Sequence, residues 1–174
     1  RSLGQAEDGL ACFCRATELA PHDTWFWYNL ADALVSLQRF EEALAPLEQA
    51  LAADPNHLDS WAKQGQVLRR LGRHREAVAA YDQALAVDPH YAWAWNGRGL
   101  ALEGLGRREE ALASFERAVQ EDPAGLWYYI NQLDPLLDLY RNDQALVVVD
   151  RALAIDDRNA TLWGRRGQIL RRLK

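Results

Sequence analysis

The sequence has no methionine and only two cysteines, and it contains no apolar run long enough to span a membrane. Cys12 and Cys14 lie two residues apart on a predicted helix, so they point in different directions and a disulfide between them is not expected. We predict two small, half-buried thiols in a reducing compartment. The first ten residues lack the hydrophobic segment of a cleavable signal, which favours a cytoplasmic protein.

Basic residues are also in the minority. The sequence holds 20 Lys and Arg against 25 Asp and Glu, for a formal net charge of −5, and this balance disfavours nucleic acid as a partner. None of the four histidines has a partner at metal-ligand spacing, and no nucleophile–base pair or paired acid marks an enzyme site. We therefore predict no metal, no cofactor and no catalytic residue in a globular chain.

What the sequence does contain is a repeat. Pro21, Pro55, Pro89 and Pro123 are each separated by 34 residues, and Asp157 occupies the next place in the series. A fixed period of this size is typical of a solenoid, in which each unit packs only on its neighbours.

The unit 56–89 shows how such a repeat is built. It contains two apolar stripes at helical spacing, separated by a Gly-Arg-His break and closed by a proline. Two antiparallel helices with one stripe each cannot bury both stripes alone, so the units must stack. The stripes consist of Trp61, Gly65, Leu68 and Gly72 in the first helix and Ala77, Val78, Tyr81, Ala84 and Leu85 in the second.

This unit resembles the tetratricopeptide repeat, and the resemblance covers the whole chain. It implies an all-α fold, a right-handed superhelical solenoid of antiparallel helix pairs. It also implies a concave groove, lined by the first helices, that takes peptide ligands. The positions that carry the resemblance are Trp61, Gly65, Ala77, Tyr81, Ala84 and Pro89.

We expect one solenoid over residues 1–174. Residues 1–4 align with 69–72 and would end a truncated first helix, followed by a second helix over 6–20. Because the chain starts and stops inside a repeat, we expect a segment of a longer protein, with a self-associating array as the alternative. The predicted parts are the end of a truncated repeat at 1–21, whole repeats at 22–55, 56–89, 90–123 and 124–157, and a further first helix at 158–174.

Four positions of each first helix lie about a third of a turn from the core stripe. In the unit 56–89 they are Asp59, Ala62, Gln66 and Arg69, and core packing does not dictate them. The resemblance implies that this face lines the groove. Reading it in every repeat, we predict that a partner contacts the apolar residues Trp25, Tyr28, Trp93, Trp127 and Ile130 and the polar residues Arg69, Asn96 and Asn131.

Three of the seven tryptophans carry most of this prediction, because the core of the repeat does not explain them. Exposed indoles lower solubility unless a partner covers them, and tryptophan is enriched at binding hot spots. The alternative is that each ring folds over a neighbouring helix. The three are Trp25, Trp93 and Trp127, whereas Trp27, Trp61, Trp95 and Trp163 are assigned to the core.

Two functions are compatible with these features. The first is a non-enzymatic scaffold that holds a peptide or helix of a partner protein in the groove. The alternative is the sensor or regulatory part of a larger enzyme or signalling protein. A clamp for a carboxylate-ended tail, which needs paired Lys and Asn, is not expected, because its places hold Tyr28, Asp32, Lys63, Trp93 and Gly97.

The fourth repeat departs from the others in three places. Leu133 replaces the small residue at the Gly65 position, Tyr140 replaces Gly72, and Pro135 lies within the first helix. An interior proline removes a backbone hydrogen bond, so we expect a bend or break over 131–135. Such a bend would turn Trp127, Tyr128 and Tyr129 into an aromatic pocket; the alternative is drift without function.

Overall fold

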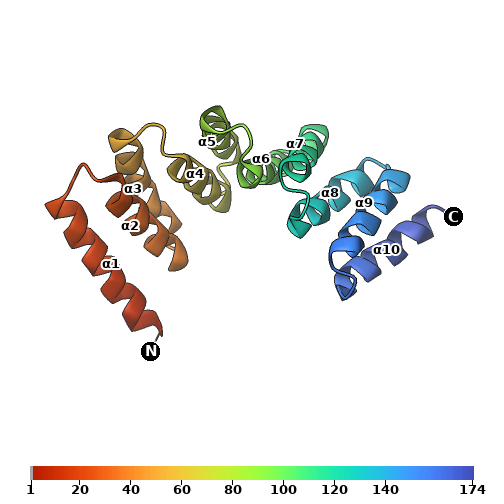
Figure 1. Ribbon diagram of the computed structural model, residues 1–174, viewed down its shortest axis with the longest axis horizontal. Helices are drawn as coiled ribbons and strands as arrows, with labels where there is room; N and C mark the ends of the chain where they lie inside the picture. Colours follow the sequence, from red (N-terminus) through yellow and green to blue (C-terminus); the bar gives the residue numbers. More distant parts are fainter. Residues whose placement is uncertain (1) are drawn as a thin grey trace. The chain divides into compact units, whose positions relative to one another are not determined.

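The computed structural model describes residues 2–174, with side chains from residue 7 onward. Over this range the regular structure consists of helices, which confirms the predicted all-α class (Figure 1). The helices are α1 (Ser2–Leu19), α2 (Thr24–Ser36), α3 (Phe40–Ala53), α4 (Leu58–Arg70), α5 (His74–Val87), α6 (Ala92–Gly104), α7 (Arg108–Glu121), α8 (Leu126–Asp138), α9 (Asn142–Ile155) and α10 (Ala160–Arg172).

The chain divides into two compact units, Arg1–Pro89 with α1 to α5 and His90–Lys174 with α6 to α10. In the first unit α2 packs between α1 and α3, and α4 packs between α3 and α5. In the second unit α8 packs between α7 and α9, while α6 packs on α7 and α10 on α9. The sequential antiparallel pairs predicted from the repeat are therefore confirmed. No helix within residues 2–174 is both long and apolar enough to cross a membrane.

The aromatic residue at the Trp61 position ties each first helix to the turn that precedes it. In four repeats its polar group donates a hydrogen bond to the carbonyl six residues earlier; the rings of Trp27 and Trp61 are partly buried there and that of Tyr129 is buried. The side chain of Trp163 is 53 % exposed, so the prediction that it belongs to the core is wrong. The bonds are Trp27 to Pro21 (2.8 Å), Trp61 to Pro55 (2.8 Å), Tyr129 to Pro123 (3.1 Å) and Trp163 to Asp157 (2.9 Å).

Leu133 is explained by an exchange of side-chain volume between the two helices of a repeat. A Cβ added at Gly65 would lie 2.9 Å from the ring of Tyr81, so an aromatic side chain at that place requires glycine opposite. In the fourth repeat the equivalent pair is Leu133 and Val149, both fully buried in one core cluster. In the fourth repeat the larger side chain of the pair therefore lies on the first helix rather than on the second, and Leu133 is a well-packed core residue.

Of the bend or break expected over 131–135, the break is wrong. Helix α8 runs without interruption from Leu126 to Asp138 with Pro135 inside it, and Pro46 lies inside α3 in the same way. Pro135 is fully buried, and packing of this helix face outweighs the one hydrogen bond that proline cannot make. The expected aromatic pocket is also wrong, because Trp127 is 70 % exposed while Tyr129 is buried at 7 %.

The start of the chain also differs from expectation. Helix α1 is continuous over Ser2–Leu19, so no helix ends at residue 4; Arg1 lies outside the described residues. Cys12 and Cys14 are free, as expected, but exposed rather than half-buried.

The first helices end in a left-handed residue that closes the last turn. This residue has φ near +60° to +75° at Gln38, Gly72, Gly106 and Tyr140, so the first repeat shares the departure from glycine seen in the fourth. The amide of the next residue bonds back to the last turn, as in Arg141 to Leu136 at 2.8 Å. Tyr140 holds this conformation although it has a side chain, which is strained.

Replacing Tyr140 with glycine is expected to raise the free energy of unfolding by about 1 kcal/mol, because the left-handed strain disappears. The tyrosine ring is 86 % exposed, so little packing is lost with it. Urea unfolding measures the change. In the matched control, Gly106→Ala, the added Cβ meets no atom within 4 Å, so the variant should lose a similar amount through strain alone. A Tyr140→Gly variant no more stable than the parent would contradict this account.

Candidate functional site

In the first unit the predicted groove residues are only partly available to a partner. Trp25 is 58 % exposed, and its ring makes edge-to-face contacts with the rings of Phe13 and Phe26. Tyr28 instead packs against the next repeat: its ring lies 5.4 Å from that of His57 and 5.8 Å below the Lys63 ammonium. Burial is the main cause that raises the pKa of Tyr28. Tyr28 therefore serves packing between repeats.

Arg69 is also held by its own repeat. It interacts with the hydroxyl of Tyr81, whose pKa burial raises to about 12, although Arg69 and its hydrogen bond oppose that rise. Trp25 lies at the start of α2 and Arg69 at the end of α4. Within one helix these two repeat positions are ten residues apart, which corresponds to about 15 Å along the helix axis. Ala62, expected on the groove face, is buried at 1 %. The structure does not bring Trp25, Tyr28 and Arg69 together into one site.

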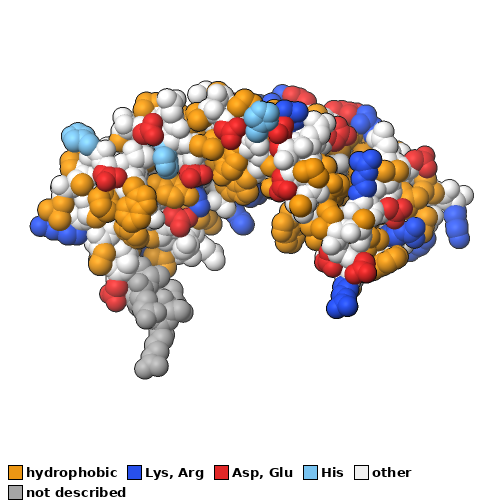
Figure 2. Space-filling model, in the orientation of Figure 1, with side chains coloured by type: hydrophobic (Ala, Val, Ile, Leu, Met, Phe, Trp, Pro, Cys, Tyr) orange, Lys and Arg blue, Asp and Glu red, His pale blue; other side chains and the backbone are white. Residues whose placement is uncertain are grey.

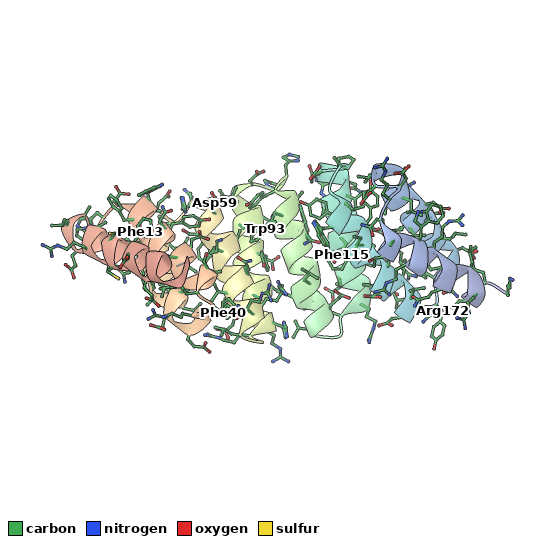
Figure 3. All side chains as sticks on the ribbon, turned by 90° about the horizontal axis from the view of Figure 1, so that it is seen from below. Phe13, Phe40, Asp59, Trp93, Phe115 and Arg172 are labelled. Carbon is green, nitrogen blue, oxygen red and sulfur yellow. The ribbon has the colours of Figure 1, made fainter. Side chains whose placement is uncertain are left out.

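In the second unit two of the predicted residues come into contact, in the first halves of α6 and α8, where the others also lie. The amide of Asn131 donates to the carbonyl oxygen of Asn96 at 2.8 Å, which joins the two helices. Trp93, near the start of α6 (Figure 3), is partly buried, and its ring lies 6.1 Å from that of Tyr91. Ile130 is partly buried on the core cluster. We call Trp93, Asn96, Trp127, Ile130 and Asn131 the aromatic end of the first-helix face.

Trp127 is the most open member of the aromatic end. Its side chain is 70 % exposed, and among the described residues it has no hydrogen bond or ring contact. Figure 2 shows hydrophobic side chains on the surface where α7 ends and α8 begins. An indole this exposed contributes little to folding and offers a large apolar contact to a partner.

The other end of the same face is acidic. Arg108 Nε donates to Asp138 at 2.7 Å, and Arg165 donates to both oxygens of Asp134 at 2.7 and 3.2 Å. Glu103, near the end of α6, is close enough to both pairs for their charges to act on it, and within the described residues it forms no hydrogen bond or ion pair. Burial, and then repulsion by Asp134 and Asp138, raise the pKa of Glu103 to about 7, while Arg108 opposes the rise. We call Glu103, Asp134 and Asp138 the acidic end.

Glu103→Gln is expected to stabilise the fold more at pH 8 than at pH 5. Because the pKa of Glu103 in the fold, about 7, exceeds its ordinary 4.5, the stability that the neutral acid contributes is complete below 4.5 and is lost as the pH rises through 7. The neutral amide avoids this loss and should gain about 1 kcal/mol at pH 8, after discounting for solvent screening. Urea unfolding at both pH values measures it. An equal effect at both pH values would contradict the assignment; Glu116→Gln, at an exposed position of α7, is the matched control.

These carboxylates do not make a metal site. In the part of the chain with described side chains, no group of three or more His, Cys, Asp or Glu residues is arranged to hold a metal ion. Two of the carboxylates are already paired with arginine, and the third is held next to them by the packing of α6 on α7 and α8. The acidic end is therefore suited to a cationic side chain, which needs no fixed coordination geometry.

The opposite face of the second unit contains a groove that the repeat pattern alone did not predict. A cavity of about 360 Å³ lies over α8 between α7 and α9, and its lining includes Tyr129, Leu136, Val147 and Val148. The equivalent cavity of the second repeat has about 240 Å³ and carries Ala79 and Ala80 at the two valine places. The sequence signal that could have revealed this groove is the change from Ala to Val at these two positions of α9. We call it the second-helix groove.

Comparison with known proteins gives consistent matches. Two family models described as "Tetratricopeptide repeat" match residues 25–90 and 62–125. No curated protein sequence matches the chain. Together the matched residues run from α2 to α7, so they include helices of both units.

Solved structures match over nearly the whole chain. MamA 41-end from Desulfovibrio magneticus RS-1 has 20% identity and a TM-score of 0.82, covering 91% of this chain and 90% of its own. YrrB, described as a TPR protein with an unusual peptide-binding site, has 23% identity and a TM-score of 0.77, covering 95% and 86%. TTC0263, a thermophilic TPR protein of Thermus thermophilus, has 25% identity and a TM-score of 0.75, covering 97% and 92%.

Proposed function

Because the chain belongs to the tetratricopeptide repeat family, we propose that it is a non-enzymatic scaffold that binds a peptide or helix of a partner protein. The binding surface is the first-helix face of the second unit, centred on its aromatic end. The observation that carries the proposal is the 70 % exposure of Trp127, four residues before Asn131, whose amide bonds to Asn96 of α6. The packing of the repeat does not explain why the Trp127 side chain is exposed to solvent.

The composition of this surface supports a peptide as its ligand. Tryptophan provides a large contact area at low entropic cost, and amide side chains hydrogen-bond to a peptide backbone. The Asn96–Asn131 bond uses one donor and one acceptor, so both amides keep further groups for a ligand. That YrrB is described as having a peptide-binding site agrees with a peptide ligand here.

Selection from a random peptide library on the immobilised chain, followed by calorimetric titration of the selected peptides, tests the proposal. Trp127→Ala is expected to weaken binding about tenfold or more, as for a buried hot-spot residue. The matched control is Val147→Ala, another exposed apolar residue of the same unit, at 52 %, on the second-helix groove. Binding that Val147→Ala weakens and Trp127→Ala leaves unchanged would contradict the proposed surface.

A further inference from the structure

Helix α10 has an apolar face that no described helix covers. The other first helices, α2, α4, α6 and α8, each pack on the second helix that follows them, whereas α10 packs on the preceding helix, α9. Leu162 and Ile169 are buried, but Leu170 is 38 % exposed, although the leucine at its place is buried in every other first helix. Trp163, Gly167 and Leu170 form one stripe, and we call them the open face of α10.

At Gly167 this face has a notch that fits an aromatic ring. Gly65 and Gly99 hold the same place in α4 and α6. A Cβ added at either glycine would collide with an aromatic ring of the following helix, that of Tyr81 or Phe115. A Cβ added at Gly167 would meet no atom within 4 Å. A second helix with an aromatic residue at the matching place would therefore fill the notch.

Helix α1 has a face of the matching kind. Phe13, labelled in Figure 3, holds the place of Tyr81 and Phe115 in the 34-residue period. Those two rings are fully buried, whereas Phe13 is partly buried, because α1 packs on α2 and on no first helix of its own repeat among the described helices. Gly9 and Ala16 are also partly buried, at places where the other second helices hold fully buried alanines. We call Gly9, Cys12, Phe13 and Ala16 the open face of α1.

The third repeat shows how such faces fit together. Between α6 and α7, Arg98 Nη1 donates to Ser114 Oγ at 2.8 Å. Arg166 of α10 holds the place of Arg98, and its Nε donates to Asp150 at 2.7 Å, which leaves its terminal amino groups for a further acceptor. Cys12 of α1 holds the place of Ser114, and its sulfur is a weak acceptor. The two open faces therefore match both contacts of the third repeat, the aromatic ring on glycine and the arginine on a small polar side chain.

Charge is complementary at the edge of the same faces. Among the described residues, neither Asp8 near the start of α1 nor Lys174 just beyond α10 forms an ion pair. In α7, Glu110 holds the place of Asp8 and pairs with Arg107 of the preceding turn. Lys174 holds the place next to that arginine, so docking would bring its ammonium to the turn beside Asp8. An exposed pair adds little affinity, but it favours this orientation of the two helices.

We propose that the open face of α10 binds the open face of α1 of a second copy of this chain, with Phe13 of one copy against Gly167 of the other. The two helices then form an antiparallel pair like those inside the chain. One copy contributes α10 and the other contributes α1, so the contact is head-to-tail, and a third copy can join in the same way. This interface is separate from the proposed peptide-binding surface and does not rest on it.

Sedimentation equilibrium of the whole chain tests the inference. The weight-average mass is expected to rise above the 19.7 kDa of one chain as the concentration increases. Gly167→Leu fills the notch of the α10 face, and Gly9→Leu adds a side chain where the helices touch, so each should weaken association about tenfold or more. Both variants are expected to stay folded, because an added Cβ at either place meets no atom within 4 Å and leucine favours a helix more than glycine does.

Mixing the two variants distinguishes a head-to-tail contact from a symmetric one. Gly167→Leu keeps an intact α1 face and Gly9→Leu keeps an intact α10 face, so their mixture is expected to form a one-to-one dimer and nothing larger. A symmetric contact between two α10 helices would leave Gly9→Leu associated by itself, and this result would overturn the inference. A parent chain that is still monomeric at about 1 mM would overturn it as well.

The two cysteines report the contact at the level of single residues. Both thiols are exposed in the free chain, but Ser114, at the place of Cys12, is buried, whereas Glu116, at the place of Cys14, is exposed. Brief alkylation with iodoacetamide, quantified by mass spectrometry, should therefore become slower at Cys12 and not at Cys14 as the protein concentration rises. In Gly167→Leu neither rate should depend on concentration. Associated chains in which Cys12 reacts as fast as in the monomer would place the contact elsewhere and overturn the inference.

Discussion

Leu133→Gly is expected to lower the free energy of unfolding by about 4 kcal/mol. The leucine is fully buried opposite Val149, so its removal leaves a cavity, and glycine also weakens the helix interior. The repeat pattern alone favours the opposite result, because glycine is the residue of two other repeats at this place. Urea or thermal unfolding distinguishes the two.

The rescue of this variant tests the exchange of volume directly. Val149→Phe alone should be destabilising because the ring collides with Leu133, but Leu133→Gly combined with Val149→Phe recreates the pair Gly99 and Phe115 of the third repeat. The double variant is expected to regain most of the lost stability. If the two effects simply add, residues 133 and 149 are not coupled and the explanation of Leu133 is wrong.

Trp61→Ala is expected to cost about 3 kcal/mol of stability, and Trp127→Ala less than about 0.5 kcal/mol. Trp61 packs into its repeat and donates to the Pro55 carbonyl at 2.8 Å, whereas Trp127 is 70 % exposed. Trp127→Ala should weaken the binding of a selected peptide more than Trp61→Ala does, when both variants are measured in their folded state. Thermal melts and titrations of the same samples provide both values.

Trp25 and Trp93 give intermediate controls for this division. Trp25 is 58 % exposed but touches Phe13 and Phe26, and Trp93 is partly buried beside Tyr91, so each should lose some stability on truncation. Only Trp93 belongs to the proposed surface. Similar destabilisation by all the alanine variants would refute the distinction between packing and binding tryptophans.

The fold could be predicted from the sequence because its determinants are local and repeated. The spacing of Trp61, Gly65 and Tyr81 sets one helix pair, and the 34-residue period copies it along the chain. The predicted repeat family and the antiparallel pairs are confirmed. The packing role of Leu133 could not be predicted, because the repeat pattern compares each position only with its own equivalents, whereas packing depends on the combined volume of two positions.

The candidate site was predicted in part for a similar reason. Trp93, Asn96 and Asn131 come together because they occupy neighbouring places on adjacent first helices, which the repeat makes visible. Tyr28 was expected in the groove but packs against His57 and Lys63 of the next repeat, contacts that a single position does not reveal. The role of Glu103 depends on carboxylates of another helix, so it emerges only from their spatial arrangement.

The most direct test of the central claim is an NMR titration of the chain with ¹⁵N-labelled tryptophan, using a library-selected peptide. Each of the seven indole N–H groups gives one signal, and single Trp variants assign them. The account predicts that the signals of Trp127 and Trp93 shift on binding, while those of Trp61 and Trp163, hydrogen-bonded to backbone carbonyls, stay in place. Saturable binding that leaves the Trp127 and Trp93 signals unmoved would contradict the claim that the first-helix face of the second unit binds the partner.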